Sequence, residues 1–320
     1  MFATSLLSAC GKLAEEVAPE TPIETPPNPV VEVIPERDKT LAFFGDSLTI
    51  GAGGSAPYGK LVGAALQGRP VFSDGIVGQG AASIAVRQGG VPLKISVEGN
   101  KLDSIKPLKL TKLSNMFLST PSRTEEYSRI GTVLGVRSTI RRTSNAGAET
   151  YTITPDTVSM IDIPADSLFL LEEATKLKSA TQILWYGTNN IGEPGAEAEI
   201  LTALESSIAF ITAPARYLVL GVLIEADENK GTANYNQAMS INDKLAAKYG
   251  EAFVRMTPPT DAELTAISYT PTAEDRTDLA NLNFPRGLRA DIKTDDIHLN
   301  DKGYQIIANR VVEKLKALKY

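Results

Sequence analysis

Short, uninterrupted apolar runs recur along this chain and alternate with stretches that have a helical pattern. The clearest runs are residues 41–44, 183–186 and 217–223. Runs of this kind are typical of parallel strands whose two faces are both covered. Towards the C-terminus, apolar side chains recur at helical spacing and predict one long amphipathic helix; they are Ile306, Ile307, Val311, Val312, Leu315 and Leu318. The pattern predicts a flavodoxin-like, three-layer α/β/α domain with a parallel sheet.

The rest of the C-terminal half follows the same alternation. Helices are predicted over 168–178, 199–212 and 235–249, and a last strand over 252–256. Residues 258–290 form a long polar segment, and segments of that length in a compact domain often serve as lids. Within it, Phe284, Pro285 and Arg286 fit either the wall of an acyl or leaving-group pocket or a plain surface excursion.

A second, β-rich module is predicted at 91–163, because the interval from Gly78 to Asn189 is far longer than one helix and one strand need. Residues 93–97 alternate apolar and polar side chains, and 133–140 and 151–163 have a similar strand pattern. The front half of the module carries lysines that fit either contact with an anionic or polymeric substrate or a solvated face; they are Lys94, Lys101, Lys106, Lys109 and Lys112.

The N-terminus predicts an anchor and a tether. Residues 1–10 end in Leu-Ser-Ala-Cys, which resembles a bacterial lipobox with Cys10 as the lipidated residue. The basic region that usually precedes a lipobox is missing, so a start further upstream and a short terminus with a buried cysteine are the alternatives. Residues 11–38 mix prolines with glutamates and predict an extended, disordered tether. We therefore expect a lipid-anchored protein of a bacterial cell envelope, with its folded domain at 39–320.

The amino-acid composition argues against several classes of function. The chain has 320 residues, of which 42% are hydrophobic, and a net charge of −6. An acidic protein of this kind is a poor partner for nucleic acid. Its single cysteine, Cys10, and single histidine, His298, exclude a metal centre built from cysteines or several histidines.

Candidate catalytic groups follow the ends of the predicted strands. The first strand runs into Gly45-Asp46-Ser47-Leu48, which places a hydroxyl at the edge where open α/β sheets build their sites. The alternative is a structural role, because aspartate and serine are also common at the N-cap of a helix. Later, the run at 183–186 stops at Gly187 and is followed by Thr188-Asn189-Asn190, either an Asn-rich turn or a source of an amide donor for a developing oxyanion.

Two further segments complete the set. Gly78-x-Gly80 begins a helix-like stretch, and as a fragment it is poor evidence for dinucleotide binding. Near the C-terminus, Asp295 precedes His298 by three positions, so a short turn lets the carboxylate reach the imidazole and fix its tautomer. A lone histidine is otherwise usually structural. Asp296 is the rival carboxylate, but the spacing favours Asp295.

In this order, the four segments resemble the SGNH hydrolases, also called the GDSL esterase/lipase family. The resemblance implies that Ser47 is the nucleophile, that His298 is its base and that Asp295 orients His298. It also implies an oxyanion hole made by the backbone N–H groups of Ser47 and Gly78 and by the side-chain amide of Asn189. The family more often has aspartate at the position of Asn190, so a supporting hydrogen bond is expected to differ there. The mechanism needs no metal and no organic cofactor.

The resemblance implies a carboxylic-ester hydrolase. The predicted lipoprotein location and the predicted β-rich insert favour O-acetyl groups on an envelope or extracellular glycan as the substrate. A lysophospholipase, lipase or thioesterase would use the same triad, and an acyl-enzyme can also pass its acyl group to a sugar hydroxyl. A non-catalytic glycan-binding lipoprotein is the alternative of another class, because a fold alone never proves activity.

Overall fold

Strand β1 (Leu41–Gly45) lies inside a parallel sheet because both of its faces are apolar. Leu41 and Phe43 belong to one buried cluster, and Ala42 and Phe44 belong to another. All five residues of the strand are buried, as expected of a strand covered on both sides. The strand therefore separates two cores, one on each face of the sheet.

The sheet has five parallel strands in the order β13-β12-β11-β1-β2. The other four are β2 (Val71–Gly75), β11 (Thr181–Trp185), β12 (Tyr217–Leu220) and β13 (Phe253–Val254). Numbered along the chain, this is the 2-1-3-4-5 order of flavodoxin-like folds. The order reverses between β1 and β11, so the ends of these two strands form the topological switch point where such sheets bind ligands.

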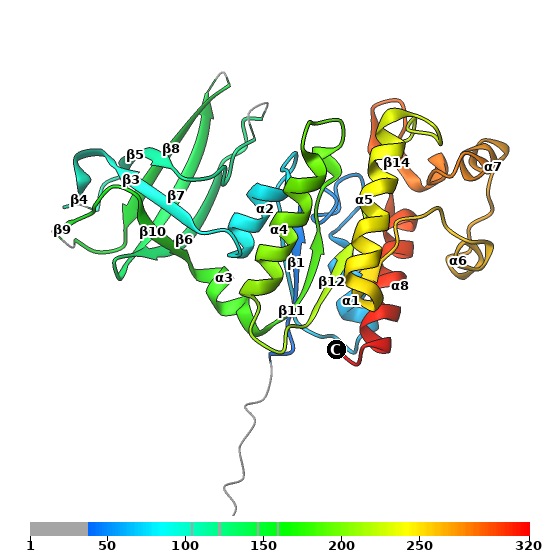
Figure 1. Cartoon of the computed structure of the whole chain (residues 1–320), viewed down its shortest axis with the longest axis horizontal. Helices are drawn as coiled ribbons and strands as arrows, with labels where there is room; N and C mark the ends of the chain where they lie inside the picture. Colours follow the sequence, from blue (N-terminus) through cyan, green and yellow to red (C-terminus); the bar gives the residue numbers. More distant parts are fainter. Residues whose placement is uncertain (1–37, 104, 121–122, 146, 159) are drawn as a thin grey trace, which may run out of the picture. The chain divides into compact units, whose positions relative to one another are not determined.

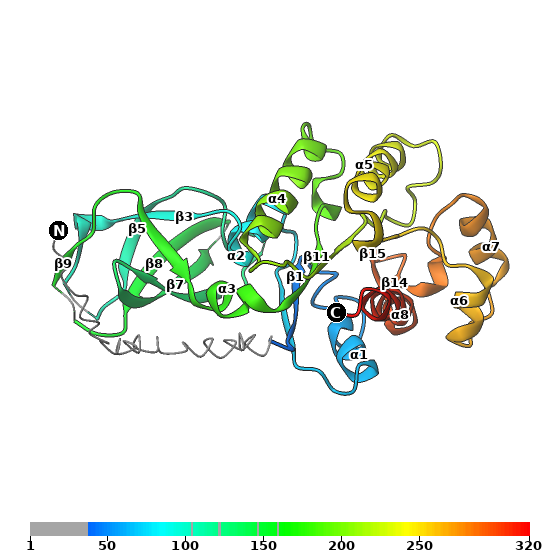
Figure 2. The same cartoon turned by 60° about the horizontal axis from the view of Figure 1, so that its bottom comes forward.

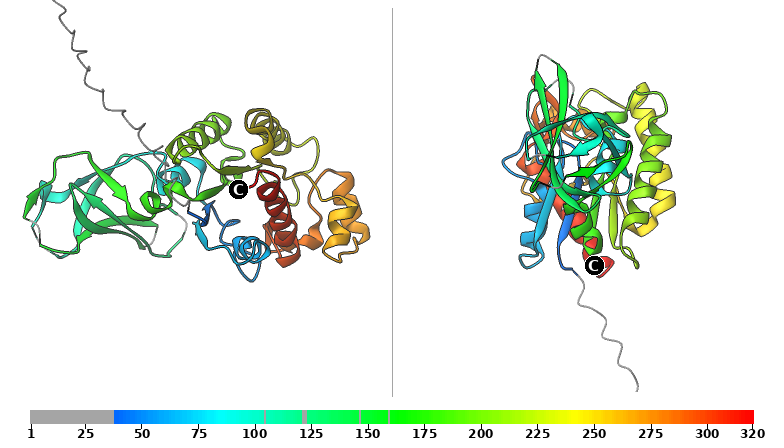
Figure 3. Two further views of the ribbon diagram at one scale, coloured as in Figure 1. Left: turned by 90° about the horizontal axis from the view of Figure 1, so that it is seen from below. Right: turned by 90° about the vertical axis from the view of Figure 1, so that its left-hand side faces the viewer.

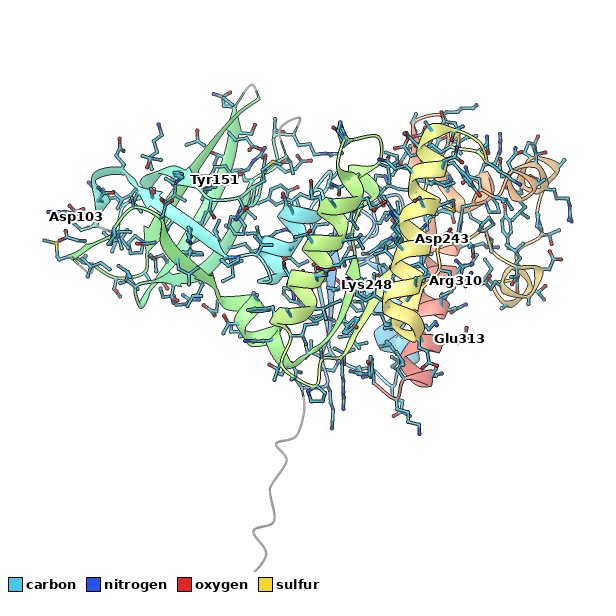
Figure 4. All side chains as sticks on the ribbon, in the orientation of Figure 1. Asp103, Tyr151, Asp243, Lys248, Arg310 and Glu313 are labelled. Atoms are coloured by element: carbon cyan, nitrogen blue, oxygen red, sulfur yellow. The ribbon has the colours of Figure 1, made fainter. Side chains whose placement is uncertain are left out.

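Helices cover both faces, as Figure 1 and Figure 2 show. One cluster of buried residues joins the sheet to α1 (Tyr58–Ala65) and α8 (Asp301–Ala317), and the other joins it to α2 (Ala81–Gln88), α4 (Ala196–Phe210) and α5 (Ala233–Tyr249). Figure 3 shows α4 and α5 on one side of the sheet and α8 on the other. On the outer surface, Lys248 of α5 forms an ion pair with Glu205 of α4 (Figure 4). The predicted three-layer α/β/α domain is confirmed.

A closed antiparallel barrel is inserted after α2, in the order β10-β3-β5-β8-β7-β6 (Figure 2). Its strands are β3 (Leu93–Val97), β5 (Leu108–Leu113), β6 (Tyr127–Val133), β7 (Val136–Asn145), β8 (Ala148–Pro155) and β10 (Ser167–Leu171). The short strands β4 (Lys101–Leu102) and β9 (Ile161–Asp162) pair with each other. Apolar side chains from these strands fill a third core, which includes Ile95, Val133, Ile140, Ile153 and Phe169. The β-rich insertion is confirmed.

Two predicted elements were wrong, and the barrel extends beyond its predicted C-terminal limit. The helix expected at 168–178 begins only with α3 (Glu172–Lys176), because residues from Ser167 form β10 and complete the barrel beyond the predicted limit of 163. Every residue from Leu168 to Leu171 is apolar, so no alternation marks the strand in the sequence. The strand expected at 133–140 is a hairpin instead, because Leu134 and Gly135 both have positive φ and form the two-residue turn between β6 and β7.

The polar segment at 258–290 also has more structure than expected. It contains α6 (Asp261–Ala266) and α7 (Ala273–Ala280), and each begins with a capping box. Strand β14 (Arg289–Asp291) follows and pairs with β15 (Asp295–Leu299). The segment is therefore a folded part of the domain that leads into the predicted catalytic histidine.

The structure is a computed structural model and describes residues 38–320 except 104, 121–122, 146 and 159. Residues Arg37–Tyr320 cluster as one compact unit, to which all the elements above belong. The predicted lipobox with Cys10, and the predicted tether up to residue 37, lie outside the described residues. Within the described ranges, no helix is both long enough and apolar enough to cross a membrane.

Candidate active site

Ser47 lies in the turn that follows β1, at the switch point of the sheet. The side chain of Asp46 accepts a hydrogen bond of 2.9 Å from the backbone N–H of Leu48, and the carbonyl of Ser47 accepts one of 3.0 Å from Ala52. These bonds hold the chain in successive tight turns directly after the strand. Ser47 is buried in this turn, with 4% of its surface exposed.

The carboxyl group of Asp46 is buried beside the nucleophile. Burial raises its pKa to about 7, although the N–H of Leu48, the charge of Arg87 and the amide of Asn189 all act in the opposite direction. One oxygen binds the Leu48 N–H, and the other accepts a 2.9 Å hydrogen bond from Asn189 Nδ2. Asp46 thus shapes the turn and also holds the predicted oxyanion donor.

The side chains of Asp295 and His298, three positions apart in β15, contact each other. Nδ1 of His298 lies 2.8 Å from each carboxylate oxygen of Asp295, and the backbone N–H of His298 donates to the same carboxylate. Burial alone would raise the pKa of Asp295, but the hydrogen bonds from His298 outweigh it and the pKa is lowered. A carboxylate that stays ionised holds the proton on Nδ1 and leaves Nε2 as the basic nitrogen.

Of the two adjacent aspartates, only Asp295 contacts the imidazole. The side chain of Asp296 lies instead with Glu225 and Asp227, where carboxylate oxygens are within 4.8 Å of one another. Burial, followed by the charges of neighbouring acids, raises the pKa of Glu225. This group is the one set of described residues with a spacing suited to a cation, but acidic clusters of this kind are common without an ion.

The histidine and the Ser47 turn are packed against each other through a glycine. Gly53 has φ +84°, and a Cβ at this position would lie 2.8 Å from Cβ of His298. Tyr304 of α8 secures the same turn by donating a 2.7 Å hydrogen bond to the carbonyl of Ala52. Nε2 of His298 is covered and has no hydrogen-bond partner within the described part of the chain, so the Ser47–His298 bond is not formed here. Catalytic hydrogen bonds are often long before substrate binds.

The predicted oxyanion donors come from the ends of β2 and β11. Gly78 is exposed in a turn after β2 with φ +75°, and a Cβ there would meet nothing within 4 Å, so the space over it is open. Asn189 follows β11 and is exposed. Its Nδ2 donates at 2.9 Å to Asp46 and at 3.1 Å to the carbonyl of Gln79, so both of its N–H groups are engaged.

Asn190, where the resemblance led us to expect a different hydrogen bond, supports the same region. Its side-chain oxygen accepts a 2.9 Å hydrogen bond from the N–H of Ala81, the first residue of α2. Glu199 accepts the next N–H, that of Ala82, at 3.1 Å. Because the first N–H groups of a helix lack partners within it, these side chains fix the start of α2 beside Gly78.

Sequence reasoning missed the buried polar residues beneath the site. Arg87 is 2% exposed and donates to the carbonyls of Gly45 at 2.7 Å and Asp74 at 2.9 Å. Its Nε donates at 2.8 Å to the side chain of Gln79. One guanidinium therefore joins the end of β1, the end of β2 and the Gly78 turn. The sequence signal that could have revealed this buried arginine is its position directly after the apolar residues Ile84-Ala85-Val86.

The turn that carries Ser47 contacts the carboxylate-bound histidine through Gly53 and the amide of Asn189 through Asp46. This set of groups is suited to nucleophilic attack on a carbonyl group. Two apolar cavities lie elsewhere. One of about 500 Å³ is lined by residues such as Val91, Leu170 and Phe210, and one of about 300 Å³ by residues such as Ile224 and Phe284.

No protein-family model and no curated protein matches the chain. Among solved structures, the chain is similar to a protein from Desulfitobacterium hafniense assigned to the lipolytic G-D-S-L family, with 9% identity over 87% of this chain and 99% of that one and a TM-score of 0.43. It is also similar to an inferred acylhydrolase from Bacteroides fragilis, with 12% identity over 89% and 90% of the two chains and a TM-score of 0.43. An alpha/beta hydrolase enzyme from the metagenome of Lake Arreo, Spain, has 14% identity over 88% and 97%, also with a TM-score of 0.43. Likenesses at this level carry no weight for function, which we infer from the geometry of the site.

Proposed function

We propose that this protein is a serine carboxylic-ester hydrolase with Ser47, His298 and Asp295 as its catalytic triad. The observation that carries the proposal is the Asp295–His298 pair, with both carboxylate oxygens 2.8 Å from Nδ1 and with Gly53 packed between the histidine and the Ser47 turn. An ionised carboxylate on Nδ1 makes Nε2 the proton acceptor. The only histidine of the chain is thereby placed against the turn that carries the serine.

The reaction proceeds in two acyl transfers. His298 Nε2 takes the proton of the Ser47 hydroxyl as Oγ attacks the ester carbonyl carbon, and it returns that proton to the alcohol oxygen when the C–O bond breaks. Water then attacks the acyl-serine with the same histidine as base, and the carboxylic acid leaves as Oγ regains its proton. The negative charge of each tetrahedral intermediate falls on the former carbonyl oxygen.

The oxyanion is bound by the backbone N–H groups of Ser47 and Gly78 and by the side chain of Asn189. Preorganised donors are effective here because they need little reorganisation when the charge develops. In the free enzyme, both N–H groups of Asn189 are held by Asp46 and Gln79. One of them must turn, or be shared, when the oxyanion forms.

Within this class we favour O-acetyl groups on an envelope or extracellular glycan as the substrate. The apolar cavities of about 500 and 300 Å³ are lined by none of Ser47, Asn189 and His298, which supports a short acyl group over a long one. The lipobox at Cys10 and the tether support a lipid-anchored location at the bacterial cell envelope, where acylated glycans are found. The barrel beside the site supports a polymeric substrate.

Hydrolysis of para-nitrophenyl esters from acetyl to dodecanoyl tests the proposal, with Ser47→Ala as the blank. A sharp kcat/KM preference for acetyl supports a small acyl pocket and acetylated glycans. A preference for long chains would replace this substrate by a lysophospholipid, another lipid ester or a thioester. If neither hydrolysis nor labelling by a fluorophosphonate probe occurs with folded protein, the result favours the alternative of a non-catalytic glycan-binding protein.

A further inference from the structure

The barrel reaches the active site through the segment between β5 and β6. Phe117 and Leu118 of this segment are fully buried in the cluster that also contains Ile76 and Val86. Ile76 begins the turn that carries Gly78, and Val86 belongs to α2. The barrel segment is therefore packed directly against the turn that presents a predicted oxyanion donor.

Gln79 connects that turn to the barrel by hydrogen bonds. Its Nε2 donates to the carbonyl of Phe117 at 3.0 Å and to that of Ser119 at 3.2 Å, and its Oε1 accepts from Arg87 at 2.8 Å. The side chain is 1% exposed, so all of these bonds are shielded from water. Its own carbonyl accepts the 3.1 Å hydrogen bond from Asn189. A single residue thus joins the barrel to the oxyanion donor.

An ion-pair chain forms a second connection at the end of β2. Arg129 of β6 binds the carboxylate of Asp74, which also lies 2.7 Å from Arg87. Asp74 is 5% exposed, and burial, which alone would raise its pKa, is outweighed by the two guanidinium groups, which lower it. The carboxylate is therefore ionised at neutral pH and joins the barrel to the guanidinium that supports Gln79.

The barrel segment is itself held from within the barrel. Arg142 of β7 is fully buried, forms an ion pair with Glu149 of β8 and donates a 2.7 Å hydrogen bond to the carbonyl of Thr120. Glu149 accepts a 2.7 Å hydrogen bond from the N–H of Thr120 and a longer one from Tyr151, which Figure 4 places on β8. The position of the carbonyls that Gln79 binds is thus set by the barrel interior.

We propose that the inserted barrel is part of the catalytic scaffold, and that Gln79 and Arg129 are positioning residues that hold the Gly78–Gln79 turn and Asn189 in place. This inference rests on the proposed esterase function. It assigns the insert a role in the turnover of any ester, including one without a glycan. A substrate-binding module would instead act on the affinity for large substrates.

The experiment compares Gln79→Met and Arg129→Met with wild type on para-nitrophenyl acetate, which carries no glycan for the barrel to bind. Misplacement of catalytic groups by about 1 Å can cost roughly a hundredfold. We expect Gln79→Met to lower kcat about ten- to a hundredfold, with little change in KM, and Arg129→Met to lower it less. Arg129→Lys, which keeps the charge, is expected to recover much of the loss.

The matched control is Arg141→Met, which breaks an ion pair with Glu126 on the outside of the same barrel, where both side chains are more than half exposed. It should leave kcat and KM at wild-type values. Wild-type kcat in both Arg129→Met and Gln79→Met, or a rise in KM alone, would overturn the proposal. An inactive wild-type protein would instead refute the esterase function itself. Arg129 is partly exposed, so Arg129→Met is expected to fold even if Gln79→Met does not.

Discussion

Asn189 donates its side-chain amide to the carboxylate of Asp46, a residue 143 positions away in the sequence and adjacent to the nucleophile. The bond joins the ends of β1 and β11 across the switch point of the sheet. It means that the predicted oxyanion donor is positioned by the residue next to the serine. The predicted oxyanion donor is therefore hydrogen-bonded to the turn that carries the nucleophile.

Replacement of Asn189 by alanine should lower kcat strongly while the protein stays folded. Loss of one oxyanion donor typically lowers kcat by about 10²–10³. The side chain is exposed, so its removal leaves no cavity in the core. Steady-state kinetics on para-nitrophenyl acetate and thermal unfolding measure the two effects. A kcat within a few-fold of wild type would show that Asn189 is not an oxyanion donor.

Asp46 should make the stability of the protein depend on pH. Its pKa is raised from 3.8 to about 7 in the folded state, so the neutral form is preferred there. The stability that this group contributes is fully present below its unfolded pKa and is lost as pH rises towards 7, by roughly 4 kcal/mol at most. Asp46→Asn cannot ionise, so its stability relative to wild type should improve from about pH 4 to about pH 7 and then stay constant.

Urea unfolding of wild type and Asp46→Asn at several pH values measures this difference. The asparagine also places an N–H group where either Leu48 or Asn189 donates, which adds a loss that does not vary with pH. Only the slope of the difference therefore reports the titration. A difference that is the same at every pH would show that Asp46 titrates normally.

Asn190→Ala should destabilise the fold without acting on the chemistry directly. It removes the acceptor for the buried N–H of Ala81, and an unsatisfied buried donor costs about 1–3 kcal/mol. Asn190→Asp keeps the acceptor oxygen and is the matched control. The free energy of unfolding in urea is the measurement, and equal stability of the alanine and aspartate variants would contradict the assigned role.

Cys10→Ser tests the proposed anchor. If Cys10 is lipidated, the serine variant should move from the membrane fraction to the soluble fraction when it is produced in a bacterial host with its export signal intact. Ser47→Ala, made in the same host, should stay with the membranes because its Cys10 is unchanged. Retention of the serine variant in the membrane fraction would refute the proposal that Cys10 carries a lipid anchor.

The sheet and the candidate site were predictable from sequence because both depend on local patterns. The apolar runs that became β1 and β11 stop at Gly45 and at Gly187, and polar groups follow at both strand ends. The capping boxes at Thr260 and Thr272 were also readable, since each threonine is followed three positions later by an acid. They were overlooked because the surrounding sequence is polar and shows no helical stripe.

The remaining features depend on tertiary contacts that no local pattern reports. Residues Leu168–Leu171 of strand β10 are all apolar, and only the pairing of this strand with β3 and β6 decides that it is extended. The roles of Gln79, Arg87 and Asp74 arise because the turn after β2, helix α2 and the barrel meet in one buried place. A buried arginine is stable only where carbonyls and a carboxylate surround it, and those partners lie far apart in the sequence.

Asp295→Asn should lower kcat sharply, whereas Asp296→Asn should not. Asparagine at 295 keeps the size of the side chain but loses the charge that holds the proton on Nδ1 of His298, and in a Ser-His-Asp triad this change lowers kcat by about 10⁴. Asp296 lies next in the chain, but its side chain is directed to Glu225 and Asp227, so its loss leaves the imidazole unchanged. The kcat of the two variants on para-nitrophenyl acetate, with circular dichroism to verify folding, makes the comparison. Equal losses in both would show that charge near the turn, and not the Asp295–His298 contact, supports the reaction.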